Sequence, residues 1–290
     1  MKAMNASPGT SRAVRRRRHP WFNLVNLGAL ILVVVTALPL YWMAAASFKS
    51  QEEIGANPPT LFPTNPTLDN YGDAFGTNSL GHYLLNSTVV ALSSTAVVLG
   101  LALFAGYALA RLPVRGSGTI MVGLLMISVF PAIAVVTPLY LVERSLGLLN
   151  SHLGLIIPYV AFHLPFAVWI MRNSLVGLPR GLEEAAEIDG ASITRTLLSV
   201  VLPLARPGLF TAGVFTFTAT WTEFLMAITL NSEDSARTVP VGIALFGSEY
   251  SIPYGAIFAG AMSATVPIAI LVLVFRRSII SGLTSGAVKG

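Results

Sequence analysis

The sequence contains no cysteine among its 290 residues, and only 11% of its residues are charged. The lack of cysteine excludes disulfides, thiolate metal sites and a catalytic thiol. The charged fraction is less than half of the value of about 25% that is typical of soluble domains. Hydrophobic residues make up 54% of the chain, more than a soluble core of this size can hide from water. We therefore expect lipid to surround most of the chain.

Motifs for catalysis and nucleotide binding are also missing. The sequence has no phosphate-binding loop of the form Gly-x-x-x-x-Gly-Lys-Ser/Thr. Its four histidines, His19, His82, His152 and His163, are too dispersed to form a metal-binding motif. No serine lies in a nucleophile-elbow context. We therefore expect this chain to be no enzyme, to bind no metal and to hold no cofactor of its own.

Six segments are long and apolar enough to cross a bilayer, which takes about 20 residues of helix. Helices are expected because lipid offers no hydrogen-bond partner to an open backbone, and the alternation of a β-barrel is not visible. The segments run from about Leu24 to Ala46, Ser87 to Ala110, Thr119 to Val142, Leu153 to Gly177, Gly208 to Leu230 and Tyr254 to Phe275. The predicted fold class is an all-α polytopic membrane protein with one six-helix domain, residues 21–276. This domain lies between a basic N-terminal tail, residues 1–20, and a C-terminal tail, residues 277–290.

The basic residues predict the orientation of the chain. If the N-terminus is inside the cell, only Lys49, Arg144 and Arg237 of the 18 lysines and arginines lie outside. This excess of positive charge on the inner side predicts that both termini are cytoplasmic. We interpret the run Arg15–Arg18 as an anchor at an anionic lipid surface, and not as a patch that binds nucleic acid. The apolar stretch that follows is too long for a signal peptide, so we expect it to be retained as the first span.

The predicted cytoplasmic loop from about residue 172 to 207 carries the most distinctive pattern. Pro179 can start a short helix, and Glu183 and Glu184 suit the positive end of that helix. Gly190 can end it. The expected product is a short surface helix with an acidic rim.

The helix also contains two small residues, Ala185 and Ala186, which allow another surface to approach closely. A second helix is expected to start near Ser192 and to end before Pro203. Taken alone, this pattern fits either a docking surface for another protein or an ordinary solvated connector.

The same loop resembles the signature of permease subunits in binding-protein-dependent ATP-binding cassette (ABC) importers. The matching residues are Glu184-Ala185-Ala186, Asp189-Gly190-Ala191, Leu202-Pro203 and Pro207. Leu197 and Val200 stand where the family usually has Phe and Ile. Further matches to its sugar-importing branch, the maltose-permease-like family, are Pro66–Tyr71, Gly147–Asn150, Trp221–Phe224 and Gly282–Gly290. Thr222 departs from the Asn that is usual in that branch.

The resemblance implies the type I importer fold, in which the loop serves as a coupling helix that sits in a cleft of the ATPase subunit. The residues implied in this docking are Glu183, Glu184, Ala185, Ala186, Asp189, Gly190 and Ala191. The implied complex has two permease chains, which are different from each other, two ATPase domains that bind ATP and Mg, and an extracytoplasmic sugar-binding protein. It lies in the cytoplasmic membrane of a prokaryote. The implied function is alternating access for a di- or oligosaccharide, driven by ATP hydrolysis in the partner.

Four residues within the spans are candidates for lining the substrate path: Tyr159, His163, Thr220 and Glu223. Ionisable residues in a span are costly, which makes them functional candidates. Aromatic rings beside hydrogen-bonding groups suit a sugar. Glu223 is expected on one helical face of the fifth span together with Thr220. Packing and hydrogen bonding between helices are the alternative interpretation.

Two other functions stay open at this point. One is an importer of the same architecture for a glycerol-phosphate compound or a polyol. A phosphate would favour basic residues in the path, and the predicted spans contain almost none. The other is a secondary transporter that works alone and is driven by an ion gradient. The coupling signature and the scarcity of carboxylates in the spans both argue against a secondary transporter.

Overall fold

The computed structural model describes residues 24–247 and 252–284. The chain divides into two units, residues 1–42 and residues 43–290, which are described separately. The first unit contains most of α1 (Leu24–Ser47), which matches the predicted first span. Its side chains from Val25 to Tyr41 are exposed although most are apolar, as expected of a helix whose solvent is lipid. The predicted basic tail, residues 1–20, lies outside the described residues.

The second unit is helical, and no strand occurs in the two described stretches. Its α-helices are α2 (Gln51–Ile54), α3 (Asp69–Phe75), α4 (Leu80–Arg111), α5 (Ser117–Val129), α6 (Ala132–Leu146), α7 (His152–Val176), α8 (Gly181–Ile188), α9 (Ile193–Thr196), α10 (Leu202–Trp221), α11 (Leu225–Leu230), α12 (Val239–Ala244) and α13 (Tyr254–Thr284). A π-helix at Leu197–Val201 joins α9 to α10, and a 3-10 turn covers Asp234–Ala236. By length and composition, five helical segments of the described chain can cross a membrane, or six if α5 and α6 together form one span.

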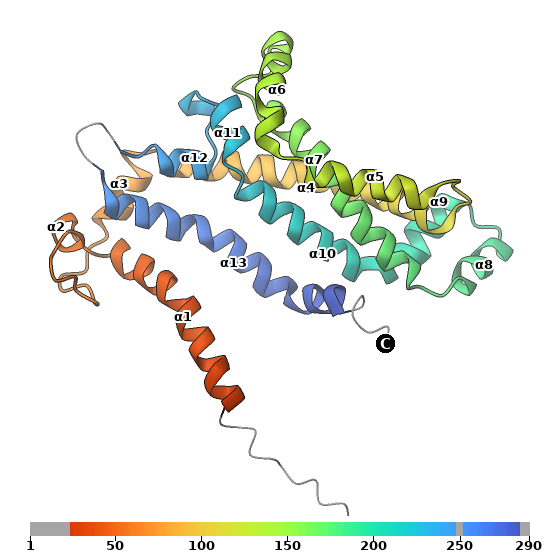
Figure 1. Cartoon of the computed structure of the whole chain (residues 1–290), viewed down its shortest axis with the longest axis horizontal. Helices are drawn as coiled ribbons and strands as arrows, with labels where there is room; N and C mark the ends of the chain where they lie inside the picture. Colours follow the sequence, from red (N-terminus) through yellow and green to blue (C-terminus); the bar gives the residue numbers. More distant parts are fainter. Residues whose placement is uncertain (1–23, 248–251, 285–290) are drawn as a thin grey trace, which may run out of the picture. The chain divides into compact units, whose positions relative to one another are not determined.

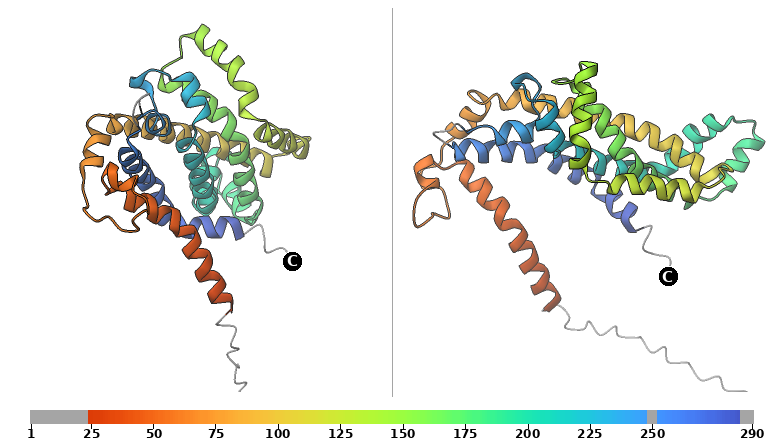
Figure 2. Two further views of the ribbon diagram at one scale, coloured as in Figure 1. Left: turned by 60° about the vertical axis from the view of Figure 1, so that its left-hand side comes forward. Right: turned by 45° about the horizontal axis from the view of Figure 1, so that its top comes forward.

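Three long helices form the centre of the second unit. Helix α4 packs against both α7 and α10, and α10 also packs against α13 (Figure 1). Both views of Figure 2 show α5 beside α7, and they show that α6 turns away from the direction of α5. The side chains at the centre are almost completely buried; they include Val98, Met171, Leu175, Leu197 and Ala212.

Helices α7 and α10 approach closely where Gly208 faces Ser174. A Cβ atom on Gly208 would collide with Ser174 Oγ and would lie 2.5 Å from Ser174 Cβ. Only a residue without a side chain fits this contact. Such small-residue contacts allow backbones to approach within a membrane, where packing is the main force between helices.

Gly208→Ala is therefore expected to destabilise the chain by about 1–3 kcal/mol through overpacking. The measurement is the thermal unfolding midpoint in detergent. Gly123→Ala in α5 is the matched control, because a Cβ there meets nothing within 4 Å and alanine favours the helix. Adding Ser174→Gly should remove most of the Gly208→Ala penalty, measured relative to Ser174→Gly alone. An unchanged midpoint in Gly208→Ala would contradict the close contact.

The third span was predicted as one helix, and this is wrong. The chain bends by 86° between α5 and α6. Pro131 lies at the bend and serves as the N-cap of α6, and Phe130 before it is extended with ψ 131°. The extended conformation follows from the steric clash that a proline creates with the preceding residue. The second span also begins earlier than predicted, since α4 starts at Leu80 and not near Ser87.

The predicted end of a helix before Pro203 is also wrong. The helix continues from Ile193 through the π-helix into α10. Pro203 has no N–H to donate, and its ring would collide with a carbonyl in a regular α-turn. The π-turn relieves this conflict: the amide of Leu202 bonds to the carbonyl of Leu197, five residues earlier.

The last two spans differ from the prediction at their ends. The fifth span starts well before Gly208 and is interrupted at residues 222–224, between α10 and α11. Helix α13 runs to Thr284, beyond the predicted end at Phe275, so residues 277–284 of the predicted tail are helical. Residues 285–290 lie outside the described part of the chain.

The segment after α1 contains the short helices α2 and α3, and side-chain hydrogen bonds hold it together. The Lys49 side chain is buried and its Nζ atom donates to the carbonyl of Thr60. Asn70 at the start of α3 donates to the carbonyls of Ser47 and Lys49 at 2.9 and 2.7 Å. Glu53 accepts from Thr60 Oγ1 at 2.7 Å, and this hydrogen bond lowers the pKa of the Glu53 carboxyl below its usual value. These bonds fold the loop onto the start of α3.

Candidate functional site

Helix α8 forms where the signature predicted it. Its first turn contains Glu183 and Glu184, and Asp189 is its C-cap. Gly190 has a φ of +78°, and its amide bonds to the carbonyl of Glu187. The Ala191 amide bonds to the carbonyl of Ala186 at 2.9 Å. This pair of bonds is a Schellman motif, which confirms the prediction that Gly190 ends the helix.

One of the two glutamates is directed into the protein. Glu183 Oε1 lies 2.7 Å from Arg111 Nε, and the side chains of Glu183 and Arg111 are only 12% and 6% exposed. Tyr107 Oη donates to Glu183 Oε2 at 3.1 Å, and Arg111 also donates to the carbonyl of Leu178 at 2.8 Å. Glu183 was predicted to lie on the acidic rim of the docking surface, but it instead attaches α8 to the end of α4.

The other face of α8 is free. Glu184, Glu187 and Asp189 are exposed, as are Ala185 and Gly190. Ile188, which the signature does not include, is 86% exposed. Leu182 and Ile193 in the same loop are also exposed, at 43% and 57%, so the loop presents several large apolar side chains, and exposed apolar groups of this kind occur at protein contact surfaces. We define this free face as the α8 surface: Glu184, Ala185, Glu187, Ile188, Asp189 and Gly190.

The structure brings Tyr159 and Glu223 into direct contact, and His163 and Thr220 lie next to them. Tyr159 of α7 is 1% exposed and donates its hydroxyl hydrogen to Glu223 Oε2 at 2.6 Å. His163 lies one turn along α7, with its ring 6.2 Å from that of Tyr159. Thr220 is buried in the last turn of α10. Neither His163 Nε2 nor Thr220 Oγ1 forms a hydrogen bond within the described chain.

Glu223 does not lie on a continuous helical face with Thr220, as was predicted. It lies in the interruption between α10 and α11 and accepts from the amides of Met226 and Ala227 at 2.9 and 3.1 Å. The interruption explains the difference, because the helical spacing used for the prediction does not hold across it.

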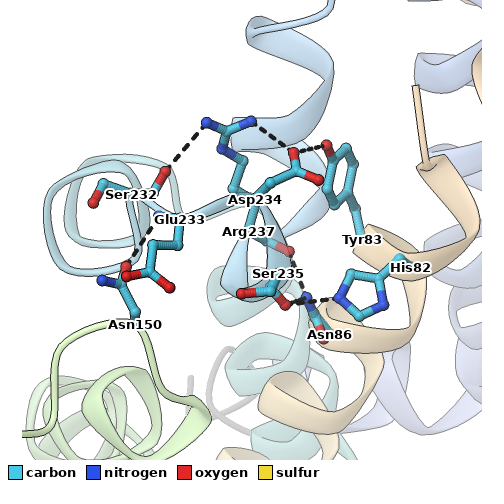
Figure 3. Close-up of polar contacts among 9 residues, drawn as sticks. All are labelled: His82, Tyr83, Asn86, Asn150, Ser232, Glu233, Asp234, Ser235 and Arg237. Carbon is cyan, nitrogen blue, oxygen red and sulfur yellow. Dashed lines mark hydrogen bonds and ion pairs between the residues drawn. The ribbon is translucent and has the colours of Figure 1, made fainter. Parts of the chain in front are cut away.

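A polar network that the sequence did not indicate lies at the end of α4 opposite to α8. Figure 3 shows its side chains, which come from α4, from the turn before α7 and from the segment after α11: His82, Tyr83, Asn86, Asn150, Ser232, Glu233, Asp234, Ser235 and Arg237. The Asn86 amide group donates to the carbonyls of Ser235 and Arg237 at 3.0 and 2.9 Å. The Tyr83 hydroxyl donates to Asp234 Oδ1 at 2.5 Å, and Arg237 forms an ion pair with the same carboxylate at 2.8 Å.

The network fixes the segment after α11 on α4 and on the turn before α7. The residues that it joins to α4 are about 150 residues away in the chain, so no local pattern could reveal these contacts. The only local signal was the spacing of Asp234 and Arg237, which suits an ion pair within one turn.

Comparison with known proteins gives the family. Residues 98–285 match the family described as "Binding-protein-dependent transport system inner membrane component", which is more than half of the chain. The sulfoquinovosyl glycerol transport system permease protein SmoH of Agrobacterium fabrum is 40% identical over 264 residues, covering 91% of this chain and 93% of that protein. The trehalose/maltose transport system permease protein MalG of Thermococcus litoralis is 37% identical over 270 residues, with coverages of 92% and 96%.

A solved structure shares the fold. It belongs to a bacterial ABC transporter involved in the import of the acidic polysaccharide alginate, and one of its chains superposes with a TM-score of 0.75 at 22% identity. The superposition covers 93% of this chain and 99% of that one. This likeness confirms the predicted fold class, an all-α permease of the type I importer fold. On the family match and the two relatives, this chain belongs to the inner membrane components of binding-protein-dependent transport systems.

Proposed function

We propose that this permease admits a di- or oligosaccharide through an ABC importer whose ATP hydrolysis takes place in a separate subunit. The observation that carries the substrate class is the agreement among the relatives, whose names refer to trehalose, maltose and sulfoquinovosyl glycerol. The trehalose transport system permease protein SugB of Mycobacterium tuberculosis adds a 38% match over 262 residues. All three relatives are covered over more than nine-tenths of their length.

The proposal assigns a partner to each end of the protein. The α8 surface docks on an ABC ATPase subunit, which binds ATP and Mg; this chain holds no cofactor and performs no catalysis. A second, different permease chain completes the path, and an extracytoplasmic sugar-binding protein delivers the substrate. Both termini lie in the cytoplasm of a prokaryote. The exposed apolar residue among the carboxylates of α8 supports the ATPase contact.

In the proposed cycle, the loaded binding protein docks at the end of the bundle away from α8. ATP closes the ATPase dimer, which moves α8. Because Glu183 is paired with Arg111 at the end of α4, the movement of α8 is transmitted to a helix that packs against α7 and α10. The helices then open the path to the other side, and hydrolysis resets them.

The test is uptake into proteoliposomes that contain this chain, co-expressed with the products of its neighbouring genes. Trehalose and maltose are compared with glycerol 3-phosphate and with a polyol. Vanadate is added while the membrane potential is held constant. Saturable, vanadate-sensitive uptake of a disaccharide supports the proposal. Uptake of glycerol 3-phosphate or the polyol alone would change the substrate class, and uptake that persists under vanadate would favour a secondary transporter.

A further inference from the structure

The fifth span is interrupted inside a region that the fold places among apolar helices. Helix α10 ends at Trp221 and α11 begins at Leu225. The first amides of α11 therefore have no helical carbonyl before them. In an apolar environment each such amide costs several kcal/mol unless another group accepts its hydrogen. Something at the interruption has to supply acceptors.

Glu223 supplies them from within the interruption. Its Oε1 accepts from the Met226 amide at 2.9 Å, and its Oε2 accepts from the Ala227 amide at 3.1 Å. The buried hydroxyl of Tyr159 donates to the same Oε2 at 2.6 Å. The carboxylate thus receives three donors, which occupy most of the roughly four acceptor positions that it offers. Little capacity is left for a sugar hydroxyl.

The far end of α11 is attached to the same part of the chain as Tyr159. The Asn150 amide donates to the carbonyl of Leu230 at 3.0 Å. The Asn231 side chain donates to the carbonyl of Ser151 at 3.2 Å. Both Asn150 and Ser151 immediately precede α7. The start of α11 is therefore held to α7 and its end to the residues just before α7, and α11 also packs against α6. Towards α10, the chain runs through the non-helical residues 222–224.

We propose that Glu223 and Tyr159 are positioning residues that attach α11 to α7, so that α11 moves with α7 and independently of α10 during transport. This inference rests on one part of the proposed function, namely that the helices move relative to one another during transport. It replaces a substrate-binding role for Glu223 and Tyr159. It leaves His163 and Thr220 as the path candidates at this level, because His163 Nε2 and Thr220 Oγ1 form no hydrogen bond within the described residues.

The test uses the complete transporter with three variants of this chain: Tyr159→Phe, Glu223→Gln and the double variant. Tyr159→Phe removes the hydroxyl that donates to Glu223. Glu223→Gln replaces one carboxylate oxygen by an NH2 group, so the side chain can no longer accept all three hydrogen bonds. The maximal uptake rate should fall about threefold in Tyr159→Phe and at least tenfold in Glu223→Gln. The half-saturating substrate concentration should stay within about twofold, and the double variant should be no worse than Glu223→Gln, because the two residues act through one contact. Tyr140→Phe, a part-buried tyrosine of the neighbouring α6, is the matched control.

A second measurement needs no substrate. The chain has no cysteine, so spin labels can be placed on Phe224→Cys and Ile157→Cys, two exposed positions beside Glu223 and Tyr159. The distribution of distances between the two labels should be narrow when the chain carries no further substitution. It should broaden when Glu223→Gln or Tyr159→Phe is added, but not when Tyr140→Phe is added. This result would hold even if the transported solute were not a sugar.

Two outcomes would overturn the inference. One is a tenfold or larger rise in the half-saturating concentration with an unchanged distance distribution, which would make Glu223 a substrate ligand. The other is the absence of any change in rate and distance. If the transporter does not assemble with Glu223→Gln, the milder variant Tyr159→Phe tests the inference by the same two measurements, uptake and label distance.

Discussion

Glu183→Ala is expected to lower the coupling of ATP hydrolysis to uptake at least tenfold, because it leaves the Arg111 guanidinium buried without its counter-charge. The Arg111 side chain is 6% exposed, and the carboxylate 2.7 Å from its Nε is the only acidic partner that the described chain gives it. Removing one member of a buried ion pair costs about 3–5 kcal/mol. Glu183 retains some exposure, so we expect the lower end of this range, about 3 kcal/mol. That value corresponds to a roughly 100-fold weaker attachment of α8 to α4.

Hydrogen exchange measures this attachment directly. The amides of α8 should exchange faster in Glu183→Ala, while those at the centre of α4 should be unchanged. Glu184→Ala is the matched control for this measurement, because the neighbouring side chain is exposed and has no partner within the described residues. The swapped pair Arg111→Glu with Glu183→Arg should recover part of the protection. Equal exchange in Glu183→Ala and Glu184→Ala would show that the ion pair does not hold α8.

The two glutamates show where prediction from sequence ends. Glu183 and Glu184 are adjacent, and both suit the first turn of a helix. Only the three-dimensional packing distinguishes them, because Arg111 is 72 residues away in the chain. The helix itself and its end at Gly190 were predictable, since both depend on local backbone preferences. The same holds for the apolar spans, whose composition alone identifies them.

The interruptions of the spans were less predictable, although prolines mark one of them. Pro131 stands at the bend between α5 and α6. Other prolines lie inside continuous helices: Pro39, Pro138, Pro158, Pro165, Pro207 and Pro267. Whether a proline breaks a helix depends on whether neighbouring groups satisfy the freed carbonyl. The interruption at Glu223 has no proline, and it depends on Tyr159 from another helix.

Ile188→Asp is expected to abolish the binding of the ATPase subunit and to reduce uptake at least 100-fold, while the chain itself stays folded. Ile188 is 86% exposed and contributes little to the packing of this chain. If the α8 surface docks as proposed, burial of this side chain contributes about 1.5–3 kcal/mol to the complex. A carboxylate at the same place would in addition have to give up its hydration, at a cost of several kcal/mol. Three carboxylates already surround it, at Glu184, Glu187 and Asp189.

Co-purification of the ATPase with a tagged chain measures the effect, and the unfolding midpoint in detergent shows that the fold is intact. Ile188→Val is the matched control, because it keeps an apolar side chain and should retain both the ATPase and most of the uptake. Gly190→Pro and Glu184→Lys test the same surface through its backbone and its charge. Full co-purification in Ile188→Asp would place the ATPase contact elsewhere on the chain. Loss in Ile188→Asp but not in Glu184→Lys would instead mean that apolar burial, and not the acidic rim, holds the two subunits together.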